Sequence, residues 1–248
     1  MIELTDLSKR YAAVQAVRSL NLTIPRGQIF GFIGPNGAGK TTTIKMMGGI
    51  IAPTSGSVRI CGIDMAAEPE SAKQKIGFIP DRPYLYEKLT AMEFLQFTAD
   101  LYGINRNGFI HSAKAKLRQF SLIEWADELI ESFSHGMKQR LVMASAQLIQ
   151  PEVIIVDEPM VGLDPLAIKM VKELFKQLAE EGTTIFMSTH TLKVAEDVCH
   201  RIGVINNGQL IATGSPEDLM LQAQSTENDL EAVFLKLTQE PTATQLSE

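Results

Sequence analysis

The chain has 248 residues, of which 45% are hydrophobic and 21% are charged. This composition excludes a largely disordered chain, and the length allows a sizeable apolar core with one large domain or a core plus a smaller subdomain. Asp and Glu outnumber Lys and Arg by 29 to 23, giving a net charge of −6. Nucleic acid is therefore not expected as a partner, because its phosphates repel an acidic surface.

Cysteine content and hydropathy indicate where such a chain works. Cys61 and Cys199 are too few for a disulfide framework, and each is expected to be a small buried side chain. Acids at positions 3 and 6 argue against a secretory signal. The sequence also lacks an uncharged apolar stretch of about 18 residues, the length that a membrane span requires. We expect a soluble protein of a reducing compartment; if it works at a membrane, another molecule must hold it there.

Short runs of strand-forming residues occur before residue 80 and again after residue 150. The early runs, which lie about turns such as residues 24–27, are typical of an antiparallel sheet. The run at 153–156 is apolar on both faces, as in the centre of a parallel sheet. The expected strands are residues 2–7, 17–24, 28–33, 58–60, 76–79, 153–156, 183–188, 202–205 and 209–212.

Between residues 90 and 150 the hydrophobic period becomes helical. Thr90 and Glu93 have the spacing of a capping box, and a later helix is expected to stop before Pro151. The apolar faces of these two helices are expected at Phe94, Phe97 and Leu101 and at Met137, Leu141, Ala144 and Leu148. A helical insert therefore separates two β-rich portions.

Two further helix starts follow. Asp164 before Pro165 predicts a helix that ends at Gly182, and Ser215 before Pro216 predicts another. The polar tail beyond carries one apolar stripe, formed by Leu230, Val233, Phe234 and Leu237.

Residues 34–41 read Gly-Pro-Asn-Gly-Ala-Gly-Lys-Thr and directly follow the expected strand at 28–33. They match the phosphate-loop pattern, whose glycines turn backbone N–H groups inward while the next helix directs its N-terminus at the anion. Lys40 can reach the β- and γ-phosphates, and the Thr41 hydroxyl can bind Mg²⁺. A plain glycine-rich turn is the alternative, but the flanking strand and helix favour phosphate binding. The residues expected to bind nucleotide are Gly34, Asn36, Gly37, Ala38, Gly39, Lys40, Thr41 and Thr42.

Polar residues also end two later strands. Asp157 and Glu158 follow the apolar run at 153–156, and His190 follows the run at 183–188. Strand ends of a parallel sheet open into the ligand crevice. Asp157 is expected to hold Mg²⁺, Glu158 to polarise the attacking water, and His190 to contact the γ-phosphate. Solvated turn residues are the alternative for each of them alone.

The phosphate loop, Asp157, Glu158 and His190 together resemble the nucleotide-binding subunit of ABC transporters, and the resemblance spans residues 1 to about 215. They are similar to the family's Walker A motif, Walker B aspartate, catalytic glutamate and switch histidine. The resemblance implies an α/β fold with a P-loop NTPase (RecA-like) core, an N-terminal antiparallel β subdomain and an inserted α-helical subdomain. It also implies an Mg²⁺-dependent ATPase with ATP and Mg²⁺ as cofactors.

Further residues extend this resemblance. Residues 134–140 are similar to the family signature sequence, residues 161–165 with Asp164 to its D-loop, and Tyr11 to the aromatic that stacks on adenine. Ser134 and Gly136 at a helix N-terminus form a second phosphate-binding surface. The family implies that this surface meets the P-loop of another subunit. A second ATP-binding subunit, in a homodimer, is thus an expected partner.

Three positions depart from the family pattern. His135 replaces the first of the two glycines after the signature serine, and Met137 replaces the final glutamine. Asp81 replaces the Q-loop glutamine, where its carboxylate keeps an oxygen facing the metal. These departures concern turnover and subunit coupling more than nucleotide binding. We expect slow basal hydrolysis, with His135→Gly preserving or raising it.

Residues 76–90 and the tail at 230–238 resemble the ABC-2-type exporter branch. That branch implies a separate transmembrane permease subunit and a place at the cytoplasmic face of the cell membrane. The expected domains are an ATPase domain at 1–215, with a helical subdomain at about 84–150, and a helical tail at 216–248. The alternatives are a non-transport ABC ATPase acting on DNA or the ribosome, and a weakly hydrolysing nucleotide sensor.

Overall fold

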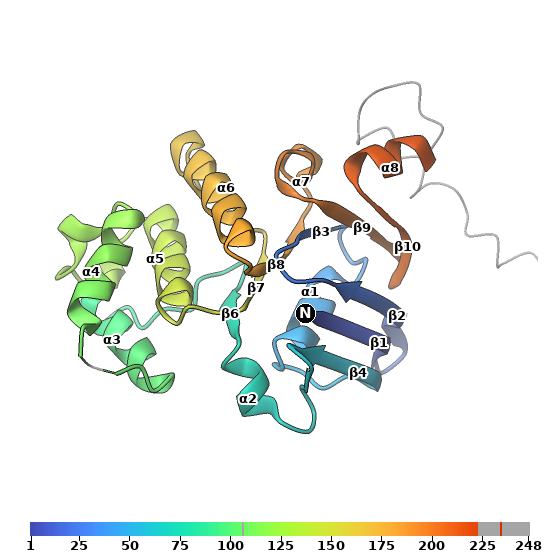
Figure 1. The fold of residues 1–248 in the computed structure, drawn as a ribbon, viewed down its shortest axis with the longest axis horizontal. Helices are drawn as coiled ribbons and strands as arrows, with labels where there is room; N and C mark the ends of the chain where they lie inside the picture. The colour runs from blue at the N-terminus through green and yellow to red at the C-terminus, as the bar shows by residue number, and fades with distance from the viewer. Residues whose placement is uncertain (106, 223–233, 235–248) are drawn as a thin grey trace, which may run out of the picture.

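An antiparallel sheet forms one end of the protein (Figure 1). The computed structural model describes residues 1–105, 107–222 and 234. In the antiparallel sheet the strand order is β2-β1-β4-β5, and the early turns and alternating burial favour this pairing. Its strands are β1 (Ile2–Tyr11), β2 (Val14–Ile24), β4 (Ser55–Ile60) and β5 (Ile63–Asp64).

A six-stranded sheet of order β10-β9-β3-β8-β7-β6 forms the centre. All its pairs are parallel except β9 with β10. The strands are β3 (Ile29–Ile33), β6 (Ile76–Ile79), β7 (Val153–Asp157), β8 (Thr184–Thr189), β9 (Arg201–Asn206) and β10 (Gln209–Gly214). The expectation that all the early runs belong to an antiparallel sheet is wrong for β3 and β6. Every residue of β3 is buried, which suits the centre of a parallel sheet.

Helices cover both faces of the parallel sheet and form a separate group beyond its β6 edge, where Figure 1 shows α3, α4 and α5 side by side. The helices are α1 (Lys40–Met47), α2 (Pro69–Lys73), α3 (Ala91–Leu101), α4 (Phe109–Gln119), α5 (His135–Leu148), α6 (Pro165–Glu180), α7 (Leu192–Val198) and α8 (Pro216–Gln222). Short 3-10 helices occupy Ile123–Trp125 and Ile130–Ser132. The mixed α/β fold with an antiparallel sheet and inserted helices is confirmed.

The start of α3 is the predicted capping box. Glu93 N donates to Thr90 Oγ1 at 3.2 Å, and Thr90 N donates to Glu93 Oε2 at 2.8 Å. The predicted apolar face of this helix is only partly right. Phe94 is buried, but Leu101 is 68% exposed. The helix instead buries a face that includes two alanines, formed by Ala91, Phe94, Leu95 and Ala99.

Alternate residues of β3 connect two hydrophobic clusters. Ile29 and Ile33 join the cluster under α3 to α7, whereas Phe30 and Phe32 join the cluster under α1 and the antiparallel sheet. Because every other side chain points to the opposite face, this one strand belongs to both cores. It thereby fixes the loop that follows it between the two layers.

The remaining sequence predictions concern the cysteines and the tail. Cys199 is buried, as predicted, whereas Cys61 is only half-buried in the β4–β5 turn. Ser215 caps α8, since Asp218 N donates to its Oγ at 3.1 Å. Phe234 of the predicted tail stripe packs against the larger cluster. The other stripe residues, Leu230, Val233 and Leu237, lie outside the described residues.

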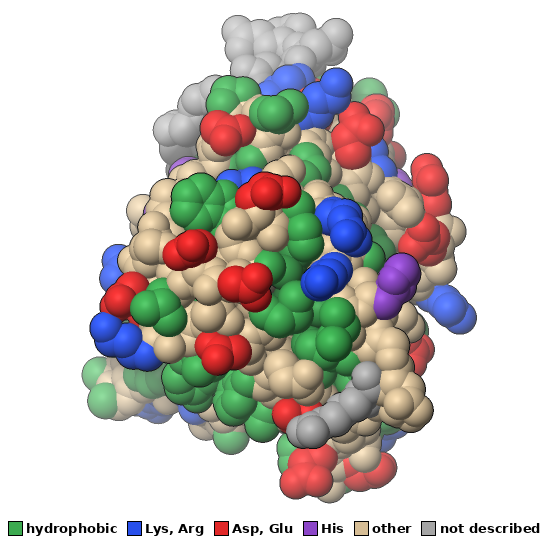
Figure 2. Space-filling view, turned by 90° about the vertical axis from the view of Figure 1, so that its left-hand side faces the viewer, with side chains coloured by type: hydrophobic (Ala, Val, Ile, Leu, Met, Phe, Trp, Pro, Cys, Tyr) green, Lys and Arg blue, Asp and Glu red, His purple; other side chains and the backbone are tan. Residues whose placement is uncertain are grey.

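No helix among the described residues 1–105, 107–222 and 234 combines the length and the apolar character that crossing a bilayer requires. The outer face of the α3–α5 group is shown in Figure 2. There, hydrophobic side chains gather among acidic and basic ones.

Candidate active site

The predicted phosphate loop joins β3 to α1. Gly39 has a φ of 111°, and a Cβ on it would lie 2.5 Å from the Ala16 carbonyl oxygen, so only glycine fits at this position. The helix begins at the next residue, Lys40. The loop therefore has a positively polarised helix N-terminus at its end, as a polyphosphate site requires.

Lys40 places its ammonium inside the loop. The side chain is buried, and its Nζ donates to the carbonyl oxygens of Gly34 at 2.7 Å and Pro35 at 3.2 Å. Burial lowers the pKa of Lys40, while the nearby carboxylates of Glu158 and Asp157 act in the opposite direction. A bound polyphosphate would add negative charge beside this buried cation and so favour its charged form.

The acidic side of the site comes from the ends of β7 and β8. Asp157 is buried at the end of β7, and Ser188 Oγ on β8 donates to its Oδ1. Parallel pairing places these two residues opposite each other. The next residue, Glu158, has a φ of 51°, and its N donates to the Ser188 carbonyl oxygen at 3.1 Å. This bend turns Glu158 out of the strand and into the crevice.

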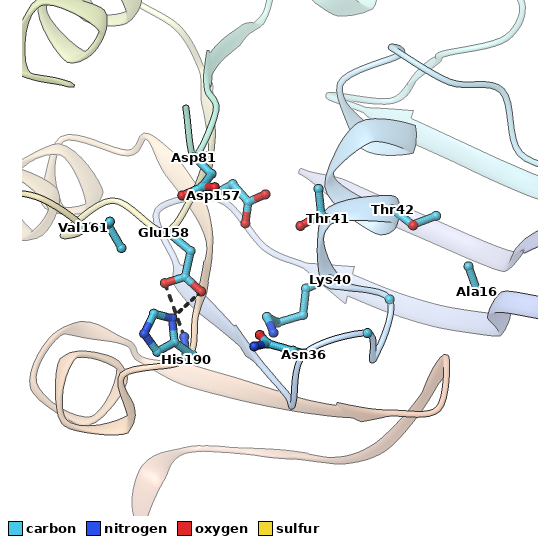
Figure 3. Close-up of a pocket in the computed structure, with 12 residues that line it drawn as sticks. Ala16, Asn36, Lys40, Thr41, Thr42, Asp81, Asp157, Glu158, Val161 and His190 are labelled. Atoms are coloured by element: carbon cyan, nitrogen blue, oxygen red, sulfur yellow. Dashed lines mark hydrogen bonds and ion pairs between the residues drawn. The ribbon is translucent and has the colours of Figure 1, made fainter. Parts of the chain in front are cut away.

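Glu158 and His190 form a contact pair (Figure 3). Glu158 Oε1 lies 2.9 Å from His190 Nδ1, and His190 N donates to Glu158 Oε2 at 3.4 Å. The ring and the backbone of His190 thus each contact one oxygen of the carboxylate. A carboxylate held in this way can polarise a water molecule in the cavity.

The phosphate loop and the acidic strand ends line one cavity of about 440 Å³, here called the nucleotide cavity. Figure 3 shows Asp81 and Asp157 together on one side, with Thr41 and Lys40 across from them. The residues that line it are Ala16, Asn36, Gly37, Gly39, Lys40, Thr41, Thr42, Asp81, Asp157, Glu158, Val161 and His190. Ten of the residues named from the sequence thus meet at one place.

The predicted Mg²⁺ ligands Thr41, Asp81 and Asp157 all line this cavity. Their hydroxyl and carboxylate oxygens are the hard donors that Mg²⁺ prefers. Within the described part of the chain, no group of three or more His, Cys, Asp and Glu side chains could hold a metal ion alone. The residues present fit Mg²⁺ that is shared with phosphate oxygens, which is its usual arrangement in such sites.

Six residues named from the sequence do not line the cavity. Gly34 and Ala38 lie in the loop itself and are buried. The other four residues lie outside both the loop and the cavity: Tyr11, Ser134, Gly136 and Asp164.

Those four residues occupy the ends of elements around the site. Tyr11 is 45% exposed at the end of β1, with Lys9 Nζ 5.3 Å from its ring centroid. Ser134 and Asp164 cap α5 and α6, accepting from Met137 N at 3.3 Å and Ala167 N at 2.8 Å. Ser134 and Asp164 are exposed, and Gly136 is half-buried, so a second molecule can reach this surface.

Sequence reasoning missed two residues of the site: Ala16 lines the cavity, and Ser188 holds Asp157. Val161, which also lines the cavity, was named only as part of the stretch that resembles the D-loop. The polar Ser-Thr-His end of the 183–188 run was a usable signal for Ser188, since polar groups at a strand end face the crevice. Ala16 gave no signal, because it reaches the site only through the packing of the β1–β2 hairpin on the loop.

A phosphate loop between a parallel strand and a helix, facing an aspartate and a glutamate at the end of another strand of the same sheet, defines a P-loop ATPase site. The family model described as ABC transporter matches residues 17–161 of this chain. That span is more than half of the sequence. The chain therefore belongs to the ABC transporter family.

Two curated relatives are similar over most of the chain. The linearmycin resistance ATP-binding protein LnrL of Bacillus subtilis (strain 168) is 38% identical, over 88% of this chain and 70% of that protein. The Nod factor export ATP-binding protein I of Burkholderia pseudomallei (strain 1710b) is also 38% identical, over 88% of this chain and 72% of that protein.

Solved structures agree with this assignment. The structure titled "Structure of ATP binding subunit of ABC transporter" has a TM-score of 0.90 and 34% identity, covering 96% of this chain and 99% of that chain. A dimeric post-hydrolysis state of the cassette MJ0796 bound to ADP and Pi has a TM-score of 0.77 and 26% identity, covering 87% and 98%.

These findings confirm several expectations. The chain is an ATP-binding, ATP-hydrolysing subunit of the ABC transporter class, with ATP and Mg²⁺ as its cofactors. Subunits of this class pair with a second cassette and work with a membrane-spanning partner.

Proposed function

We propose that this chain hydrolyses ATP in the nucleotide cavity to drive export through a separate membrane-spanning permease. The observation that carries the proposal is the arrangement of opposite charges about one cavity. Lys40 lies inside the phosphate loop, and Asp157 and the Glu158–His190 pair face it from the strand ends. Binding, metal coordination and water activation can therefore act on one ATP molecule.

Each residue has a proposed role that follows from its position. Lys40 neutralises charge on the β- and γ-phosphates, and the N-terminus of α1 adds its backbone donors. Thr41, Asp157 and Asp81 hold Mg²⁺, which neutralises phosphate charge when bound. Glu158 accepts a proton from the attacking water, and His190 holds the Glu158 carboxylate in place.

The second half of the site is proposed to come from another copy of the chain. Ser134, Gly136 and Asp164 lie outside the nucleotide cavity, and Ser134 caps a helix whose N-terminus favours an anion. In a homodimer this surface would close over the ATP held by the partner's phosphate loop. Tyr11, at the exposed end of β1, is proposed to stack on adenine.

A hollow next to the nucleotide cavity is the proposed docking site for the permease. It has a volume of about 530 Å³, and we call it the partner hollow. Tyr84 and Ile50 at its edge are 84% and 55% exposed. Thr41, Asp81 and Asp157 line both this hollow and the nucleotide cavity. A partner that moves the Asp81 loop therefore changes the proposed metal site directly.

Export and location are further parts of the proposal. The name of the relative from Burkholderia pseudomallei describes an export system, and residues 76–90 resemble the exporter branch. Docking at the partner hollow would hold the chain on the cytoplasmic face of the cell membrane. The domain division at residue 215, with a helical subdomain at about 84–150, also remains a proposal.

Glu158→Gln tests the proposed mechanism. The substitution is nearly isosteric and removes basicity, so ATP binding should survive while turnover falls at least about 100-fold. With Mg²⁺ and ATP the variant should then elute as a dimer in size-exclusion chromatography, whereas with ADP it should elute as a monomer. A variant that stays monomeric with ATP at high protein concentration would refute the composite dimer, and wild-type turnover would refute the role of Glu158.

A further inference from the structure

The N-terminal end of α5 lies against the loop that follows Glu158 in the same chain. A Cβ on Gly136 would lie 3.0 Å from the Gly162 carbonyl oxygen. A Cβ on Gly162 would lie 2.2 Å from Cδ2 and 2.9 Å from Nε2 of His135. The His135 ring therefore occupies the space that a side chain at position 162 would need. Two backbones meet here at a pair of glycines, with an imidazole ring packed at their side.

Backbone hydrogen bonds between residues three apart connect this loop to the proposed general base. Val161 N donates to the Glu158 carbonyl oxygen at 3.3 Å, and Leu163 N donates to the Met160 carbonyl oxygen at 3.4 Å. Glu158 itself has a φ of 51°, a strained conformation for a residue other than glycine. Such a conformation persists only where the surroundings hold it, so support for the loop near Gly162 is also support for Glu158.

We propose that His135 is a positioning residue for ATP hydrolysis. Its ring packs on Gly162, holds residues 158–164 against α5 within one chain, and so keeps the Glu158 carboxylate in place. The inference rests on the proposed function, in which Glu158 activates water. It assigns to His135 a packing role in its own chain that needs no proton on the imidazole.

The contact predicts that His135→Gly slows hydrolysis, whereas the sequence alone led us to expect that this substitution preserves or raises it. Loss of the ring leaves space beside Gly162, and the loop can then move away from α5. Small misplacements of a catalytic group slow chemistry by about 10-fold to 100-fold. We therefore expect kcat to fall about 10-fold in His135→Gly, with the KM for ATP within about twofold of the wild type.

His135→Phe separates packing from imidazole chemistry. Phenylalanine keeps a ring beside Gly162 but has no hydrogen-bond donor. If packing is the role, kcat in His135→Phe recovers to within about twofold of the wild type, and the pH profile of kcat is unchanged. If His135 instead contacts phosphate across the dimer, His135→Phe is as slow as His135→Gly, and the proposal is wrong.

Gly162→Ala approaches the same contact from the other side. Its Cβ displaces the His135 ring, so this variant alone should lower kcat. In the His135→Gly background the displaced ring is absent, so the second substitution should cost much less than it does alone. The matched control is Gly62→Ala in the β4–β5 turn, where φ is 79° and, apart from its two chain neighbours, no described residue has an atom within 4 Å of the new Cβ. It carries the same backbone strain and should leave kcat unchanged.

The outcomes distinguish this inference from the proposed function. If wild-type protein hydrolyses ATP and Glu158→Gln does not, the proposed function stands. A wild-type kcat in His135→Gly, or full additivity of His135→Gly and Gly162→Ala, then overturns the proposed role of His135 and leaves the proposed function intact. Thermal unfolding of each variant shows that the fold is retained, so a lower kcat cannot come from a smaller folded fraction, and an unchanged KM shows that ATP binding is intact.

Discussion

The charged ammonium group of Lys40 is buried and hydrogen-bonded to backbone carbonyl oxygens. Its ammonium is held by the oxygens of Gly34 and Pro35, and burial lowers its pKa. Burying a charge in this way costs free energy that folding must offset elsewhere. The conformation is therefore better explained by binding of an anion than by stability.

Lys40→Ala should remove most of the affinity for ATP and all measurable hydrolysis, because the loop loses its positive charge while keeping its backbone donors. Isothermal titration calorimetry measures the loss. Lys169→Ala, at an exposed position of α6, is the control for removing one positive charge and should bind ATP normally. ATP affinity in Lys40→Ala that equals the wild type would contradict the phosphate-loop assignment.

Cys199 should make the stability of the protein depend on pH. Burial raises the pKa of its thiol to about 12 from an ordinary 9.0. The unfolded chain therefore releases the thiol proton first, and stability is full below pH 9 and falls as the pH rises from 9 toward 12. The slope is about 1.4 kcal/mol per pH unit, or about 4 kcal/mol over the whole window.

Comparison with Cys199→Ala isolates this effect from other groups that titrate at high pH. Urea unfolding at several values above pH 9 should show a smaller decrease of the unfolding free energy in the variant. Equal slopes in the two proteins would show that the thiol ionises in the folded state. Such a result would contradict close packing of Cys199 against Gly31, where a Cβ would lie 2.7 Å from its Sγ.

Among the secondary-structure elements, helix α5 has one feature that stabilises the fold and one that destabilises it. Ser134 caps its N-terminus, which favours the helix. Gln139, in contrast, is 1% exposed, and neither its Nε2 nor its Oε1 has a hydrogen-bond partner in the described part of the chain. Leaving a buried amide unpaired costs about 1 to 3 kcal/mol. This helix is thus not optimised for stability at its N-terminal end, where it packs near the loop at 158–164.

Gln139→Met should raise the free energy of unfolding by about 1 to 3 kcal/mol, because it removes the unpaired amide and keeps a side chain of similar length. Chemical denaturation measures this change. Gln147→Met on the same helix is the matched control, since Gln147 is also buried but its Oε1 accepts from Lys116 Nζ at 2.9 Å. The control should lose stability. A loss in Gln139→Met as well would mean that its amide is paired in solution.

At the scale of the whole molecule, charge and surface argue against direct binding to lipid. The net charge is −6, and the face shown in Figure 2 mixes acids with bases and has no basic stripe. Anionic lipids attract proteins chiefly through clustered Lys and Arg. Attachment to a membrane is therefore expected to depend on a protein partner at the partner hollow.

The purified chain should stay in the supernatant when protein-free vesicles of phosphatidylglycerol and phosphatidylethanolamine are sedimented. Vesicles that carry the reconstituted permease should retain it, and Tyr84→Asp should abolish this retention. Ile110→Asp, at another exposed apolar residue on α4, should not. Tight binding to the protein-free vesicles would contradict attachment through a partner.

Features of this protein whose chemistry is local could be predicted from residue types alone. The phosphate loop, the acids after β7 and the caps of α3, α5 and α6 are each specified by residue types at short fixed spacings. Backbone donors near a glycine, or a side chain that caps its own helix, need no distant residue. For the same reason the predicted cavity residues from Asn36 to Thr42 could be named without the structure.

Contacts between distant segments followed from the three-dimensional packing and were not predictable from the sequence. The packing placed β3 in the parallel sheet between β8 and β9, and it turned α3 onto its alanine side. It also brought Ser188 to Asp157 and His135 to Gly162. These contacts depend on strand order and on how layers pack. Neither leaves a periodic signal in the chain, because a hydrophobic pattern favours one buried side of an element but does not specify the neighbour that covers it, and in α3 that neighbour selected a different side.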